Sequence, residues 1–179
     1  MTTSDEDLAR AAARGDRDAF SALLARRYDG LFGLCFRLTG NRATAEDLTQ
    51  DICLALPGKL AGFRGDARVT TWLYRIAVNA AHDRRRRAAT AARAAQGWGA
   101  VEINRRADAA AAHEARDWLA QAMACLSDEL RDTLALVTDA GLSQAEAASV
   151  LGISPGTVAW RISEIKRRLA AVREAEESA

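Results

Sequence analysis

The sequence predicts an all-α protein with two small helical domains joined by a flexible linker. Ala, Leu, Arg and Glu dominate the 179 residues, and these residue types favour helices. The chain has only 2 Pro and 12 Gly, which is too little turn chemistry for an all-β fold. An Ala-rich stretch separates two segments that carry apolar stripes of helical period. At roughly 150 residues per average domain, the length suits one compact body or two small ones.

Two amphipathic segments open the chain. A short helix is expected from about Leu8 to Ala13, with its end at Gly15. In the following segment, apolar residues recur at spacings of three and four, as on one face of a helix that ends at Gly40 and Asn41. The residues of this stripe are Phe20, Leu23, Leu24, Tyr28, Leu31, Cys35 and Leu38. Both segments are therefore predicted to be helices with one buried face.

A third helix is predicted to begin at Thr44-Ala-Glu-Asp47, which resembles a capping box with its acidic residues in the first turn. Leu48, Ile52 and Ala55 then share one face of this helix. Pro57 is expected to kink or end it, because proline lacks a backbone N–H and clashes with the preceding turn.

A loop and a fourth helix follow. The loop is predicted from Gly62 to Arg68, where turn residues occur without a sustained period. The helix is predicted from about Thr70 and runs into Arg84–Arg87; its apolar face is Leu73, Ile76, Ala77 and Ala80. The formal net charge of +1 for the whole chain conceals this basic run. Between residues 84 and 108, seven arginines stand against two acidic residues, a local balance of +5.

Residues 89–114 are predicted to form the linker, because they include few large aliphatic side chains. Structureless stretches within compact domains rarely exceed about 12 to 15 residues, so this length favours two bodies. The first domain then covers residues 1–88 and the second covers residues 115–179. In the second domain, Ser127-Asp128 is a plausible helix N-cap. It interrupts an apolar series of helical spacing: Trp118, Leu119, Met123, Leu126, Leu130, Leu134 and Val137.

The C-terminal part of the chain has the pattern of a helix-turn-helix. Gly141 ends one helix, and Ser143-Gln-Ala-Glu146 forms a capping box at the start of a short one. Gly152 permits a tight turn, and Ser154 with Pro155 supplies the cap and first residue of another helix. The inward stripe of that last helix is Val158, Ile162, Ile165 and Leu169. In this motif the second helix places its N-terminal residues in the major groove of DNA.

Basic residues on the last helix favour DNA binding over the alternative, an ordinary helical hairpin with a solvated basic end. They are Arg161, Lys166, Arg167 and Arg168, and neutralisation of DNA phosphates would need them. Trp160 lies outside the inward stripe, so it either packs on a neighbouring element or contacts DNA.

The sequence predicts no enzyme site, no cofactor and no metal. It contains no G-x-S-x-G, no G-x-x-x-x-G-K-S/T and no H-E-x-x-H motif. Cys35, Cys53 and Cys125 lack CxxC spacing, which favours core thiols over a redox or metal role. His82 and His113 are far apart in the chain and are expected at the surface. Without a signal peptide or an apolar run of about 18 residues, the protein is expected in the cytoplasm without membrane insertion.

Three blocks of the chain resemble the extracytoplasmic-function sigma factors of bacterial RNA polymerase, a group of the sigma-70 family. The first block is Ala45-Glu-Asp-Leu-Thr-Gln-Asp51. The second joins Phe63-Arg-Gly-Asp66 with Thr71-Trp-Leu-Tyr-Arg-Ile-Ala-Val-Asn79. The third joins Gly141-Leu-Ser-Gln-Ala-Glu-Ala-Ala with Leu151-Gly-Ile-Ser-Pro-Gly-Thr-Val158. The order and separation of the blocks also fit the family, over nearly the whole chain.

The resemblance implies two conserved regions and a division of labour between them. Region 2, in residues 1–88, would bind the polymerase core and recognise and melt the minus-10 promoter element. Region 4, in residues 115–179, would bind the minus-35 element through its helix-turn-helix. The residues implied to dock on a coiled coil of the largest polymerase subunit are Glu46, Asp47, Gln50 and Asp51. A solvated acidic helix face is the alternative for this set.

The DNA-binding residues implied by the resemblance fall into two sets. The minus-10 set would hold unpaired bases and the phosphates beside them: Arg64, Asp66, Arg68, Trp72, Arg75, Asn79, Arg84 and Arg85. A core position beneath the loop is the alternative for Trp72, and a solvated helix end is the alternative for the arginine run. The minus-35 set is Ser154, Thr157, Trp160, Arg161, Lys166 and Arg167.

Departures from the family limit what can be transferred. The family tends to have basic residues where Ala159 and Glu164 stand and a small polar one where Trp160 stands, so its usual promoter preference does not carry over. The implied partners are polymerase core, promoter DNA in duplex and single-stranded form, and an anti-sigma factor. Two other functions remain open: a helix-turn-helix repressor or activator, which leaves the first domain without a role, and a scaffold that binds only proteins.

Overall fold

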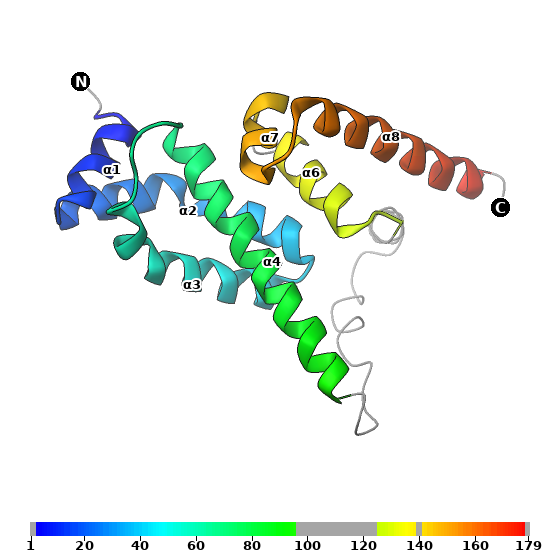
Figure 1. The fold of residues 1–179 in the computed structure, drawn as a ribbon, viewed down its shortest axis with the longest axis horizontal. Helices are drawn as coiled ribbons and strands as arrows, with labels where there is room; N and C mark the ends of the chain where they lie inside the picture. Colours follow the sequence, from blue (N-terminus) through cyan, green and yellow to red (C-terminus); the bar gives the residue numbers. More distant parts are fainter. Residues whose placement is uncertain (1–2, 96–124, 139–140, 178–179) are drawn as a thin grey trace.

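The structure, a computed structural model, describes residues 3–95, 125–138 and 141–177, and every regular element in these ranges is an α-helix. Figure 1 shows α1 to α4 as one bundle and α6 to α8 as a second. The helices are α1 (Asp5–Ala13), α2 (Arg17–Thr39), α3 (Arg42–Leu60), α4 (Val69–Ala95), α6 (Asp128–Thr138), α7 (Gln144–Leu151) and α8 (Pro155–Glu177). The predicted all-α fold is confirmed. The helical spacing predicted through Trp118 and Met123 lies outside the described residues.

Helix α2 is the centre of the first bundle. Leu31, Leu34 and Cys35 on this helix have no exposed surface. Helices α3 and α4 cover them with buried side chains that include Ile52 and Val78. Full burial of an aliphatic side chain of this size stabilises a fold by roughly 1.5–3 kcal/mol, so this layer contributes strongly to the stability of the bundle.

The predicted stripe of α2 is wrong at Tyr28, which is exposed. On the buried side of the helix, Arg27 takes the position one turn after Leu23 and one turn before Leu31. The guanidinium of Arg27 pairs with the buried carboxylate of Asp5 in α1. A polar link between α1 and α2 therefore replaces an apolar contact at this turn.

Helix α3 differs from its prediction at both ends. It begins two residues early because Asn41 is the N-cap, whose side-chain oxygen accepts a hydrogen bond from the backbone N–H of Thr44 at 2.9 Å. It also continues through Pro57 to Leu60, beyond the predicted break. Proline removes one hydrogen bond near the end of the helix, and buried Leu56 and Leu60 hold the last turn against the bundle.

Helix α4 extends to Ala95, seven residues into the predicted linker of residues 89–114. The added segment is Ala-Thr-Ala-Ala-Arg-Ala-Ala, and alanine has the highest intrinsic helix propensity. A segment that lacks large aliphatic residues can thus continue a helix that is already nucleated by packing. The rest of the predicted linker, residues 96–114, lies outside the described residues.

Helices α7 and α8 form the predicted helix-turn-helix. Ser143 caps α7. The side chain of Glu146 accepts a hydrogen bond from the backbone N–H of Ser143 at 2.9 Å, which completes the capping box. Gly152 ends α7 with φ +68°, a left-handed conformation that glycine adopts without a Cβ penalty. Ser154 caps α8 through its hydroxyl. The predicted inward stripe is buried or partly buried: Val158, Ile162, Ile165 and Leu169.

The two bundles share one apolar cluster. Helix α7 packs on α4, and α6 packs on α2. Buried Leu136 and Val150 of the second bundle belong to the same cluster as Leu34 and Val78 of the first. The helix-turn-helix therefore lies against the helix that carries the arginine run, as Figure 1 shows.

Candidate nucleic-acid and protein interfaces

The residues predicted to dock on the polymerase core, three acids and one amide, share the exposed side of α3: Glu46, Asp47, Gln50 and Asp51. Glu46 pairs with Arg42 at 2.8 Å, and Asp47 pairs with Arg84 of α4 at 3.4 Å. Exposed ion pairs of this kind contribute about 0–1 kcal/mol to stability, so a binding partner can replace them at little cost. The set is accessible and lies on a rigid, well-packed helix.

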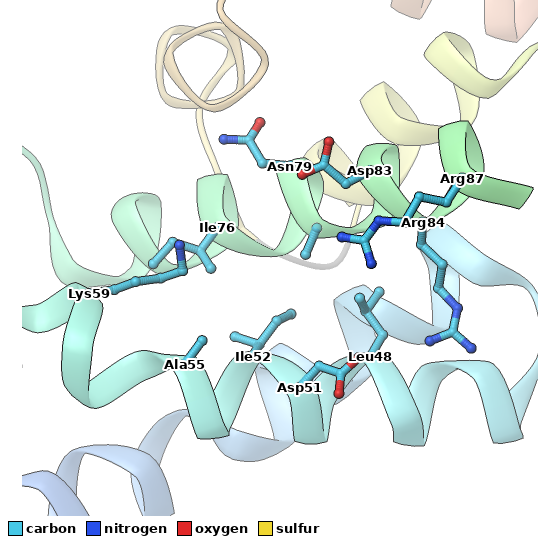
Figure 2. A pocket seen from close by; sticks show the side chains of 11 residues that line it. Leu48, Asp51, Ile52, Ala55, Lys59, Ile76, Asn79, Asp83, Arg84 and Arg87 are labelled. Carbon is cyan, nitrogen blue, oxygen red and sulfur yellow. The ribbon is translucent and has the colours of Figure 1, made fainter. Parts of the chain in front are cut away.

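A groove of about 250 Å³ lies between α3 and α4, as Figure 2 shows. Its apolar wall includes Leu48 and Ile52 of α3. Asp51 borders it from the same helix, and Asn79 and Arg84 border it from α4. The acidic face and the arginine run therefore meet along one depression, which presents both charges and apolar surface to a ligand.

A second hollow, of about 410 Å³, lies between the loop before α4 and the first turns of α4. Trp72 packs beneath the loop as the core alternative predicts, with its ring 5.3 Å from that of Phe63 in an edge-to-face arrangement. Predicted residues on the border of the hollow are Arg64, Asp66, Trp72, Arg75 and Asn79. An aromatic wall with amide and guanidinium groups around a cavity is suited to hold one extruded base.

Three arginines predicted for the minus-10 element, Arg68, Arg84 and Arg85, do not line this hollow. Arg68 pairs with Glu146 of α7 at 3.6 Å. Arg84 is at the groove described above, and Arg85 reaches the second bundle. Arg75, although it borders the hollow, donates to both the carbonyl and the hydroxyl of Ser149 at 2.7 Å.

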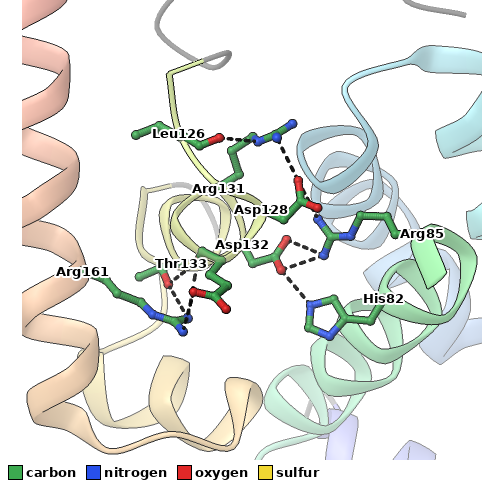
Figure 3. Close-up of polar contacts among 9 residues, drawn as sticks. His82, Arg85, Leu126, Asp128, Arg131, Asp132, Thr133 and Arg161 are labelled. Carbon is green, nitrogen blue, oxygen red and sulfur yellow. Dashed lines mark hydrogen bonds and ion pairs between the residues drawn. The ribbon is translucent and has the colours of Figure 1, made fainter. Parts of the chain in front are cut away.

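Sequence reasoning missed a polar cluster at the seam between the bundles, shown in Figure 3. The carboxylate of Asp132 in α6 accepts two hydrogen bonds from Arg85 and contacts the imidazole of His82 at 2.7 Å. His82 was expected at the surface, and it is half exposed. The expectation missed that its imidazole contacts the buried carboxylate of Asp132. The partners are 50 residues apart in the chain, so no local spacing could reveal them.

The N-terminal turns of α8 present the predicted hydroxyls and the tryptophan to solvent. The hydroxyls of Ser154 and Thr157 are hydrogen-bonded to each other at 2.9 Å. Trp160 is 64% exposed, so the alternative in which it packs on a neighbouring element is wrong within the described residues. An indole that is not needed in the core is available for contact with DNA.

Arg161, expected on an outward or flanking face of α8 and assigned to the minus-35 set, takes a flanking position and does not point to solvent. Its side chain is 14% exposed and turns toward α6. The guanidinium donates to the backbone carbonyl of Glu129 and the hydroxyl of Thr133, both at 3.4 Å, as Figure 3 shows. A long side chain at a flanking helical position can reach a neighbouring helix. The periodicity of apolar residues in the sequence does not reveal such a contact.

The C-terminal half of α8 carries a compact charge cluster. Glu164 accepts hydrogen bonds from Arg167 at 2.7 and 2.8 Å and from Arg168 at 2.7 Å. These two guanidinium groups lower the pKa of Glu164 to about 2. Arg167 is therefore neutralised within the helix, whereas Lys166 is exposed on the same stretch.

The structure agrees only in part with the prediction that the cysteines are core thiols. Cys35 is buried, and Cys53 and Cys125 are partly buried. Burial raises the pKa of the Cys35 and Cys53 thiols, which disfavours the reactive thiolate at neutral pH. The described residues contain no group of three or more side chains suited to a metal ion.

Comparison with known proteins gives matches along most of the chain. Family models match residues 23–90 as sigma-70 region 2 and residues 116–169 as sigma-70 region 4. The ECF RNA polymerase sigma factor SigM of Mycobacterium tuberculosis is 35% identical over 93% of this chain and 83% of its own length. The RNA polymerase sigma-H factor of Pseudomonas aeruginosa is 32% identical over 88% of each chain.

Two solved structures are similar in fold. CnrH in complex with the cytosolic domain of CnrY has a TM-score of 0.71 and 29% identity, covering 96% of this chain and 97% of that chain. The sigma factor RpoE of Bartonella quintana, in complex with the anti-sigma factor NepR, also has a TM-score of 0.71, with 22% identity over 87% of this chain and 96% of that one. Among the described residues, no helix has the length and apolar character needed to span a membrane.

The geometry of α8 predicts opposite roles for two adjacent residues. Arg161→Ala should lower the free energy of unfolding of the full chain by about 1 to 2 kcal/mol, because two hydrogen bonds to α6 are lost. Trp160→Ala should change it by less than about 0.5 kcal/mol, since an exposed side chain is removed. Urea unfolding followed by circular dichroism measures both. A larger loss of stability in Trp160→Ala than in Arg161→Ala would contradict these assignments.

The low pKa of Glu164 predicts a pH-dependent contribution to stability. Its folded pKa of about 2 lies below the ordinary value of 4.5, so the contribution is complete above pH 4.5 and is lost as pH falls toward 2. The difference in melting temperature between wild type and Glu164→Gln should therefore shrink across this window. When the same comparison is made in an Arg167→Ala background, the difference should depend less on pH, because this change removes the main cause of the lowered Glu164 pKa. A difference that stays constant from pH 5 to pH 2 would refute the prediction.

Proposed function

Because the chain belongs to the extracytoplasmic-function sigma factors of the sigma-70 family, which are transcription initiation factors, we propose that it binds core RNA polymerase, directs it to specific promoters and helps to open the DNA. One observation carries this proposal. The chain combines, in the family's order, a bundle with an exposed acidic helix and a loop-bordered hollow, and a second bundle with a helix-turn-helix. A repressor that used the second bundle alone would leave the first without a role.

We assign docking on the polymerase core to the acidic face of α3. Its four side chains are exposed, and the helix that bears them is held by buried Leu48, Ile52 and Leu56. A rigid helix with exposed acidic groups is suited to a basic partner surface, where electrostatic complementarity speeds association and fixes the register. The partner surface proposed is the coiled coil of the largest polymerase subunit.

The loop hollow is proposed to hold an unpaired base of the minus-10 element. Asn79 borders both the hollow and the groove between α3 and α4, so its amide can face a base edge while the strand continues along α4. The arginines of α4 are proposed to follow the phosphates of that strand. The minus-35 element is assigned to the N-terminal half of α8, through Ser154, Thr157 and Trp160.

An anti-sigma factor is the proposed inhibitory partner. The two similar solved structures contain CnrH with the cytosolic domain of CnrY and RpoE with the anti-sigma factor NepR. By analogy, a protein of that kind would bind this chain when transcription is not required. In this role the chain is a binding and strand-opening subunit rather than an enzyme, and it would act in the cytoplasm, where the polymerase meets DNA.

The core-docking assignment predicts the effect of charge reversal on α3. Asp47→Arg with Asp51→Arg should abolish promoter-specific transcripts in a run-off assay with core polymerase, because two exposed carboxylates at the docking face become cations. The fold should persist, since exposed charges contribute little to stability. Asp29→Arg, an exposed acid on α2, is the matched control and should keep wild-type activity. Full competition for core by the double variant would show that another surface docks.

The strand-opening assignment predicts a dependence on template. Asn79→Ala should reduce open-complex formation on duplex promoters, because the proposed base contact is made only after the base leaves the stack. On a premelted bubble the loss should be much smaller. Permanganate footprinting on both templates measures the two effects. Equal losses on duplex and bubble would assign Asn79 a structural role instead.

A further inference from the structure

Helix α1 contacts both walls of the loop hollow. One wall is the loop of residues 62–67, and the other is the first turns of α4. Figure 1 shows α1 beside the connection from α3 to α4. None of the residues implied for the minus-10 element lies on α1, which also precedes residues 23–90, the match to sigma-70 region 2. The function proposed above therefore gives no role to the contacts that α1 makes.

The first contact is a hydrogen bond at the start of α4. The backbone N–H of Val69, the first residue of α4, donates to Oε1 of Glu6 at 3.3 Å. The first N–H groups of a helix have no partner within it, and the side chain of the preceding residue, Arg68, has no acceptor. Glu6 supplies the acceptor, and its carboxylate also suits the positive end of the helix dipole.

The second contact is apolar. Leu8 and Ala9 of α1 are buried in one cluster with Val69, and Phe63 and Trp72 pack against this cluster. The rings of Phe63 and Trp72, 5.3 Å apart, also line the hollow. The aromatic surface that the hollow offers to a base therefore rests on side chains of α1.

The third contact is with the loop itself. Gly65 has φ +79°, and a Cβ placed on it would lie 3.9 Å from Nη2 of Arg10. A glycine in this conformation leaves the loop backbone free to move unless contacts fix it. Helix α1 is itself fixed to α2, because the buried carboxylate of Asp5 pairs with Arg26 and Arg27. One anchored helix thus limits how the two walls of the hollow lie relative to each other.

We propose that α1 is part of the minus-10 site, and that Glu6 is a positioning residue that sets the shape of the hollow. Glu6 does not touch the base. It holds the start of α4 against α1, and with it the ring of Trp72. Without this hydrogen bond the first turn of α4 frays, as unsupported helix ends do, and the two walls lose their fixed separation. The inference rests on the proposed function, because it takes the hollow to hold an unpaired base.

The test measures how strongly the holoenzyme depends on the held base. Core polymerase with the full chain is titrated against a labelled, premelted bubble of a promoter that the wild type transcribes, and binding is followed by fluorescence anisotropy. The bubble is used intact and with a single abasic site, which is moved along the nontemplate strand of the minus-10 element. Stacking of one base on aromatic side chains changes affinity by roughly 5- to 150-fold, so the wild type should lose about this much at the held position.

The variants are compared by the ratio of intact to abasic affinity at that position. Glu6→Ala removes the acceptor and should lower the ratio by about 2- to 12-fold, the range for the loss of one hydrogen bond. A smaller share of active protein would not change the ratio, because both templates would lose equally. Glu6→Gln keeps an acceptor oxygen and should retain most of the wild-type ratio. Asp18→Ala, the matched control, removes an exposed acid from the first turn of α2 and should leave the ratio unchanged.

Arg10→Ala gives a second test at an exposed residue of α1, where the contact with the loop is removed and the Val69 hydrogen bond is kept. It should also lower the ratio, and it replaces Glu6→Ala if circular dichroism shows that this variant does not fold. A folded Glu6→Ala variant with the wild-type ratio would overturn the inference. Equal losses on intact and abasic bubbles would do the same, because Glu6 would then contribute only to stability.

Failure of the proposed function gives a different result. The wild type would then direct no promoter-specific run-off transcription with core polymerase, whatever the Glu6 variants do. A wild type that transcribes but shows no abasic effect at any position would remove the base from the hollow, and the role of Glu6 would fall with it. Only a wild type with a clear abasic effect and an unchanged ratio in Glu6→Ala would reject the role of α1 alone.

Discussion

Helix α4 packs on both bundles at once, and this double packing constrains the whole molecule. Its apolar side, which includes Leu73, Ala77 and Val78, closes the core over α2 and α3. Its polar side carries Arg75 and Arg85, which bind α7 and α6. Because a close-packed helix moves as a unit, the loop before it and the arginine run along it are held in one register. The second bundle cannot leave without breaking contacts of the residues proposed to bind DNA.

The 25 basic residues of the chain are offset by 24 acidic ones, so the formal net charge is only +1. Its arginines are not a uniform basic surface, because many are paired with carboxylates on nearby helices. The main groups are Asp5 with Arg26 and Arg27, Asp132 with Arg85, and Glu164 with Arg167 and Arg168. A phosphate that binds any of these arginines competes with a carboxylate for the guanidinium. The arginine count alone therefore overstates the electrostatic attraction to DNA.

The features that could be predicted from the sequence are local ones. The capping box at Ser143 and the left-handed Gly152 depend only on neighbours in the chain, and both are as predicted. The errors arise where distant residues decide. Packing of Leu56 and Leu60 carries α3 through Pro57, and α6 takes up the side chain of Arg161. For the candidate sites, the resemblance to the family pointed to the acidic face of α3 and to the loop before α4, but neither the resemblance nor residue spacing could reveal the seam that occupies Arg75.

The end of α8 that we propose to face DNA presents the groups that the rest of the domain does not engage. A bidentate arginine on guanine is the commonest specific contact in the major groove, but Arg161 is bound to α6 and would have to leave Thr133 to make one. The outward groups in the first two turns are then the neutral Ser154, Thr157 and Trp160. Hydroxyls accept or donate to either base edge, and apolar side chains contact the methyl group of thymine. Lys166, an exposed cation further along the helix, is proposed to face the phosphates. We infer that bases and phosphates are contacted by different stretches of α8, and that Trp160 dominates base preference.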